Sequence, residues 1–128
     1  MSTKYTFGLT WNSGASNLSQ DIAVTDSAAI AIDEAIASNA TDFEIACVLA
    51  TAEIAGLWME CDQAVTVETN DATAADDTIT LRANEPLAWY TNCYYTSLLT
   101  ADVTALFVTC ATGTTGTFKM RCLYDATP

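Results

Sequence analysis

The sequence predicts an all-β protein: a single jelly-roll-like antiparallel β-sandwich of roughly 8–10 short strands. Three observations support this prediction. Apolar residues recur at every second position in several segments, turn-forming residues separate these segments, and an eleven-residue segment occurs twice. The chain has 128 residues, of which 51% are hydrophobic, so we expect one domain over residues 1–128 with a substantial buried core.

Alternation of apolar and polar residues predicts strands that have one buried and one exposed face. The clearest such segments are residues 4–11, 42–49, 65–68, 78–82 and 118–125. Residues 26–37 are ambiguous, because a capping aspartate and many alanines could begin a helix. We favour a strand there, since Ile30, Ile32 and Ile36 share one parity. The predicted turns are residues 12–17, 69–77, 84–86 and 111–116.

An internal repeat relates residues 51–61 to residues 100–110 without a gap. Each copy begins with a threonine and an acidic residue, which can bond to free backbone N–H groups at a turn. A strand follows, and its core face is predicted to carry Leu57, Met59 and Cys61 in one copy and Leu106, Val108 and Cys110 in the other. The repeat predicts a sandwich made of two similar halves related by an approximate two-fold axis.

The chain lacks the residues that most catalytic and metal sites require. It has no histidine, no glycine-rich phosphate loop, and five cysteines without metal-binding spacing. We expect all five cysteines to be small buried hydrophobic residues in a reducing compartment. Paired carboxylates remain possible, but nothing singles out a pair. We therefore predict no catalytic residue, no metal, no cofactor and no enzymatic activity.

The charge balance narrows the choice of partners. Sixteen acidic residues face four basic ones, which gives a net charge of −12. Nucleic acids and anionic membranes bind clustered Lys and Arg, so we expect neither as a partner. The N-terminal residues lack the pattern of a signal peptide, which predicts folding in a cytoplasm. The acidic loop from Asn70 to Asp77 could bind calcium, although its spacing favours a solvated turn.

Two aromatic residues of the repeat are the first candidates for a partner-binding surface. Trp58 and Phe107 occupy equivalent positions and are predicted to face outward from their strands. Large aromatic residues on exposed faces often mark protein interfaces. Alternatively, a loop or the N-terminal segment covers them.

The segment from Leu87 to Leu99 adds three tyrosines to these candidates. Trp89 shares the parity of Leu87 and is expected in the core, so Tyr90 should point outward. Tyr94 and Tyr95 cannot both face inward in a regular strand. An exposed tyrosine could stack on a sugar ring or belong to a protein interface.

Five segments of the sequence carry a family resemblance. They are residues 67–71 (Val-Glu-Thr-Asn-Asp), 77–81 (Asp-Thr-Ile-Thr-Leu), 86–90 (Pro-Leu-Ala-Trp-Tyr), 102–110 and the hairpin 117–125. Together they resemble small β-sandwich virion proteins of tailed bacteriophages, some of which are capsid decoration, or cement, proteins. The resemblance covers roughly the C-terminal half of the chain and transfers no catalytic or binding residue.

This resemblance implies a structural protein of the virion, located on the outside of the phage head. Such a protein clamps neighbouring subunits of the major capsid protein and commonly assembles as a homo-oligomer, with a trimer favoured. Two other functions stay open on the sequence. One is a carbohydrate-binding β-sandwich module, and the other is a small head–tail or tail structural component.

Overall fold

The computed structural model describes residues 2–127, without the side chain of Trp11, and contains ten strands in this range. They are β1 (Thr3–Asn12), β2 (Asn17–Asp26), β3 (Ala28–Ile36), β4 (Phe43–Leu49), β5 (Ile54–Cys61), β6 (Val65–Thr69), β7 (Thr78–Leu81), β8 (Leu87–Tyr90), β9 (Val103–Thr109) and β10 (Gly116–Tyr124). A 3₁₀ helix, η1 (Thr51–Glu53), precedes β5. No α-helix occurs within residues 2–127, which confirms the all-β prediction.

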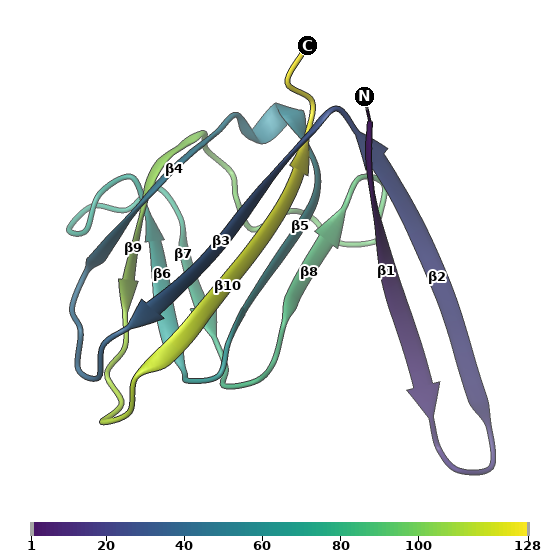
Figure 1. Cartoon of the computed structure of the whole chain (residues 1–128), viewed down its shortest axis with the longest axis horizontal. Helices are drawn as coiled ribbons and strands as arrows, with labels where there is room; N and C mark the ends of the chain where they lie inside the picture. The colour runs from purple at the N-terminus through teal and green to yellow at the C-terminus, as the bar shows by residue number, and fades with distance from the viewer. Residues whose placement is uncertain (1, 128) are drawn as a thin grey trace.

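Eight strands form two four-stranded antiparallel sheets that pack face to face (Figure 1). The β5 sheet has the order β3-β10-β5-β8, and the β9 sheet has the order β4-β9-β6-β7. The pairing is nested: β3 pairs with β10, β4 with β9, β5 with β8 and β6 with β7. Successive pairs alternate between the two sheets, so the predicted β-sandwich is confirmed.

The internal repeat corresponds to a symmetry of this connectivity. The two copies supply β5 and β9, which are inner strands of different sheets. Exchanging β3 with β7, β4 with β8, β5 with β9 and β6 with β10 converts the strand order of one sheet into that of the other. The halves β3–β6 and β7–β10 therefore have the same connectivity.

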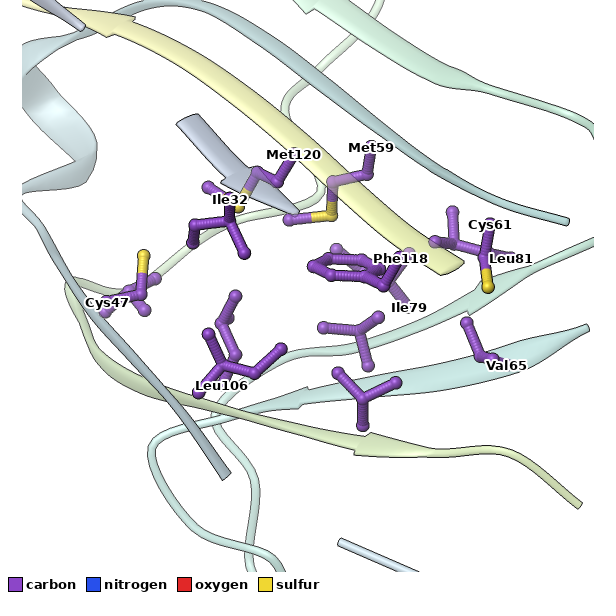
Figure 2. Close-up of a cluster of buried hydrophobic side chains, with 14 of the residues drawn as sticks. Ile32, Cys47, Met59, Cys61, Val65, Ile79, Leu81, Leu106, Phe118 and Met120 are labelled. Atoms are coloured by element: carbon purple, nitrogen blue, oxygen red, sulfur yellow. The ribbon is translucent and has the colours of Figure 1, made fainter. Parts of the chain in front are cut away.

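The core lies between the two sheets and follows the predicted parity (Figure 2). Phe118 of β10 is fully buried near its centre, among Met59 and Met120 of the same sheet and Leu106 of the opposite sheet. Residues 28–36 form a strand rather than a helix, because burial of alternate isoleucines against this core outweighs the helix-forming alanines. Local propensity is weaker than tertiary packing here.

Four of the five cysteines are buried as predicted, namely Cys47, Cys61, Cys110 and Cys122. The prediction is wrong for Cys93, which is only half-buried. The chain leaves β8 at Tyr90, and Cys93 lies in the following loop, outside the strands of both sheets.

The first two strands depart from the expected single sandwich. β1 and β2 pair with each other and join neither sheet, and we call residues 3–26 the arm. The arm begins beside the outer face of the β5 sheet and diverges from the sandwich toward its turn (Figure 1). Phe7 is buried, as its alternation predicted, but Leu9 is 52% exposed. The predicted buried face of β1 is therefore buried only near the base of the arm.

Candidate binding surfaces

A small second core holds the base of the arm on the outer face of the β5 sheet. The ring centroids of Phe7 and Tyr90 lie 5.3 Å apart. A Cβ atom on Gly56 would lie 3.2 Å from two ring carbons of Phe7, so the glycine makes room for this ring. Leu123, which lies outside the main core cluster, is also fully buried. These four residues attach the arm to its own sandwich.

The tip of the arm, residues 8–20, continues the same apolar face, and among the described residues no surface covers Leu9 or Leu18. The register pairs Phe7 with Ile22 and Leu9 with Gln20, so Leu9 and Leu18 share the face of Phe7. Leu18 is 65% exposed. The tip contains no charged residue in this acidic chain. The lack of charge in the tip can be read from the sequence and indicates an uncharged surface. Alternation of apolar and polar residues, however, could not show where the sheet that covers the base of the arm ends.

Trp58 is half-buried beside a hollow of about 400 Å³ between the arm and the β5 sheet. The hollow is lined by Lys4, Tyr5, Thr6, Phe7, Trp58 and Arg121. The N-terminal segment and Trp58 therefore border the same hollow, an arrangement between the two possibilities left by the sequence. Because a hollow remains beside it, Trp58 still borders a surface that a partner could reach.

Arg121 is held rigidly at the edge of this hollow. One of its terminal nitrogens donates hydrogen bonds to the carbonyl oxygens of Ile32 and Met120, at 3.1 and 2.9 Å. The other donates to both carboxylate oxygens of Asp33, at 3.1 and 3.2 Å. These four hydrogen bonds hold the guanidinium group in place before any partner binds.

Phe107 lies on the outer face of the β9 sheet and is half-buried. Its register partners are Glu44 on β4 and Glu68 on β6, so a glutamate flanks the ring on each side. Val48, also on β4, is 75% exposed. This face therefore combines exposed apolar side chains with negative charge.

The three tyrosine candidates separate into two environments. Tyr90 points outward from β8, as predicted, but its ring packs against Phe7 of the arm. Tyr94 and Tyr95 lie in the loop that follows β8 and are 101% and 77% exposed. The backbone carbonyl of Tyr95 accepts a hydrogen bond from the indole nitrogen of Trp89 at 3.0 Å, which ties this loop to the sandwich.

The acidic loop after β6 ties the ends of the strands together. The carboxylate of Asp77 accepts hydrogen bonds from the backbone and hydroxyl of Thr100, at 2.8 and 2.6 Å, and from the backbone of Ala101 at 3.3 Å. Partial burial raises the pKa of Asp77, but these three hydrogen bonds outweigh it and hold the pKa below its ordinary value. Asp102 likewise accepts from the backbone of Thr51, so the two repeat copies are bonded to each other.

The described residues can also be compared with what metal binding and nucleophilic catalysis by a thiol require. Within residues 2–127, no group of three or more His, Cys, Asp or Glu side chains is placed to hold a metal ion. Burial raises the pKa of Cys47 to about 11 and that of Cys122 to about 12. A nucleophilic cysteine needs the opposite shift, because the thiolate is the reactive form.

The part of the chain that the structure describes has no helix long and apolar enough to cross a membrane. The chain matches no protein-family model, no curated protein and no solved structure.

Proposed function

We propose that this protein is a structural virion protein, namely a capsid decoration (cement) protein. It binds the outside of a phage head and clamps neighbouring subunits of the major capsid protein. The arm is the observation that carries this proposal, because Leu9 and Leu18 continue its apolar face beyond the part that the described residues of the sandwich cover.

An exposed apolar hairpin of this kind favours a protein partner. A two-stranded hairpin is marginally stable in water on its own, and free strand edges promote pairing with other chains. Burying a leucine side chain contributes about 1.5–3 kcal/mol, so Leu9 and Leu18 together could anchor a contact. Because the tip has no charge, a partner can cover it without losing the hydration of an ionised group.

The connectivity of the sandwich supports the same function. Nested pairing that alternates between two sheets is the pattern of a jelly roll, and we infer that the sandwich belongs to this architecture. Jelly rolls occur in viral capsid proteins and in lectins, so the architecture is compatible with both the capsid function and the carbohydrate-binding function. The resemblance of the C-terminal half to phage virion proteins favours the capsid.

Cosedimentation with emptied heads of the phage that encodes this chain tests the proposal. We expect the wild-type protein to bind the heads, and the double variant Leu9→Ser/Leu18→Ser to lose binding with its melting temperature unchanged. The matched control is Thr10→Ala/Ser19→Ala, which alters the opposite face of the same arm and should bind normally. Wild-type protein that ignores heads, or binds only isolated tails, would overturn the capsid assignment.

A carbohydrate-binding module is the second candidate, and the exposure of Tyr94 and Tyr95 is what favours it. Exposed aromatic rings can stack on sugar rings, whereas the Tyr90 ring already packs on Phe7. A glycan array separates the two functions. Glycan binding that is lost in Tyr94→Ala/Tyr95→Ala would favour the sugar function, and an array without signal would remove it.

A further inference from the structure

We propose that the outer face of the β9 sheet is a second contact surface of this protein, and that it binds an arginine side chain from a subunit of the major capsid protein. This inference rests on the proposed function and deepens it. A protein that clamps two neighbouring subunits needs two contact surfaces, and the arm supplies only one. The arm lies beside the β5 sheet, whereas this face lies on the other side of the sandwich (Figure 1).

Two carboxylates lie on this face without a basic residue beside them. Glu44 on β4 and Glu68 on β6 are the register partners of Phe107 on β9, so a glutamate lies on each side of the ring. The rows of the register on either side are uncharged: Thr109, Thr66 and Thr80 form one, and Ala46 and Ala105 form the other. Arg82, which follows β7, is already paired with Glu85 at 3.2 Å.

The carboxylates on the outer face of the β5 sheet have basic neighbours instead. Lys119 lies between Asp33 and Glu60 in the register, and Arg121 forms a salt bridge with Asp33 at 3.1 Å. Within residues 2–127, by contrast, the side chains of the two glutamates beside Phe107 take part in no hydrogen bond or salt bridge. Of the two outer faces, the face of the β9 sheet is therefore the one that leaves carboxylates available for an external cation.

The ring of Phe107 favours a guanidinium group as that cation. The ring is half-buried on the outer side of β9, between strands that each lie about 4.8 Å away. An aromatic face attracts a cation, more often arginine than lysine, and a guanidinium group has enough donors to bond a carboxylate on each side. Val48 on β4 is 75% exposed and adds apolar surface for the stem of the arginine side chain.

Charge also distinguishes this contact from that of the arm. The chain has a net charge of −12, so a basic segment of another protein is attracted to it at long range. The tip of the arm has no charged residue, so its contact depends on apolar burial. Salt should therefore weaken the contact of the β9 sheet much more than that of the arm.

A peptide titration followed by NMR tests this face without phage heads. The probe is acetyl-Gly-Arg-Gly-amide, and the matched probe carries citrulline, the neutral isostere of arginine. We expect only the arginine peptide to shift the ring signals of Phe107 and the amide signals of β4, β6 and β9. Phe107→Leu, which keeps an apolar side chain without the ring, should weaken binding of the arginine peptide several-fold.

Two double variants separate this face from the general acidity of the chain. Glu44→Gln/Glu68→Gln should weaken binding of the arginine peptide at least about tenfold. Glu53→Gln/Glu60→Gln removes the same charge from η1 and β5 and should bind like the wild type. Equal shifts with both peptides, shifts confined to other parts of the chain, or equal binding by the two double variants would each overturn the inference.

Cosedimentation with emptied heads distinguishes this inference from the proposed function. Glu44→Gln/Glu68→Gln should weaken head binding at least about tenfold at low salt, and the difference from the wild type should shrink as salt rises. A protein that binds the arginine peptide on this face but ignores heads would overturn the capsid function alone. Heads that bind the wild type and this variant equally well would overturn the capsid subunit as the source of the arginine.

Discussion

The arm and the sandwich are built from the same kind of strand, but their apolar faces are buried to different extents. In both regions apolar side chains alternate with polar ones along extended chain. In the sandwich each apolar face meets the apolar face of the other sheet, and Phe118 between them is fully buried. In the arm only the base meets a sheet, so Phe7 is buried while Leu9 and Leu18 remain exposed.

This difference shows that alternation specifies a face but not its partner. A strand with an apolar face can be buried by a second sheet, by the outer face of a sheet, or by another molecule. The sandwich uses the first solution and the base of the arm uses the second. For the tip of the arm, where Leu9 and Leu18 are exposed, we propose the third, which is why the proposed function depends on it.

The sharpest test of this comparison removes a side chain from the centre of the sandwich. Phe118→Ala should lower the free energy of unfolding by ~3–5 kcal/mol, because it leaves a cavity between two sheets that cannot fully collapse. Urea denaturation measures this loss. Thr117→Ala, at the exposed neighbouring position of β10, is the control and should change little. A loss below about 1 kcal/mol for Phe118→Ala would mean that the core packs differently.

The next test releases the base of the arm. Phe7→Ala should cost about 2 kcal/mol, because one aromatic side chain loses its contacts with Gly56 and Tyr90 on a single face. Hydrogen exchange should accelerate in residues 3–26, while amides of β3–β10 keep their protection. Equal loss of protection in both regions would show that the arm and the sandwich unfold as one unit.

A smaller effect is expected at the loop that ties the strand ends of the sandwich. Asp77→Asn should cost about 1 kcal/mol at neutral pH, since it weakens three hydrogen bonds that a partly buried carboxylate accepts. The pKa of Asp77 is lowered on folding, so this stabilisation is present above the ordinary value of 3.8 and is lost as pH falls through the lower folded value.

Denaturation of the wild type and of Asp77→Asn between pH 7 and pH 2 measures how this stabilisation depends on pH. The gap in free energy of unfolding between wild type and Asp77→Asn should close in the acid range. Glu44→Gln serves as the control, because the Glu44 side chain makes no hydrogen bond with the described residues. A gap that stays constant down to pH 2 would contradict the role assigned to the ionised Asp77.

The smallest effect is expected at the tip of the arm. Leu18→Ser should change the free energy of unfolding by less than about 0.5 kcal/mol, because Leu18 is 65% exposed and covers no core. Thermal denaturation of the wild type, Leu18→Ser and Phe7→Ala compares the stability lost at the tip of the arm with that lost at its base. A loss similar to that of Phe7→Ala would mean that the tip packs against its own sandwich.

Much of the sandwich could be predicted from local pattern alone. Alternation placed Ile32, Cys47 and Met120 on buried faces, and the structure confirms all three. The repeat placed Cys61 and Cys110 in the core, again correctly. These predictions succeed because side-chain direction in a strand has a period of two and needs no knowledge of the neighbouring strand.

The candidate surfaces were predicted less completely. Trp58 and Phe107 do point outward, but only the structure shows that the arm and Trp58 border one hollow and that glutamates flank Phe107. Tyr94 and Tyr95 could not be placed, because the strand that contains Tyr90 ends before them. Burial of an outward side chain depends on which distant segment crosses it.

The sequence by itself determined that the chain is all-β, which side of most strands is apolar, and where the main turns lie. Only the tertiary structure decided the nested pairing of the strands, the separation of the arm from both sheets, and the incomplete burial of Cys93. The physical reason is the range of the interactions. Alternation and turn chemistry act over a few residues, whereas pairing and coverage join segments far apart in the chain, such as Phe7 with Gly56 and Tyr90.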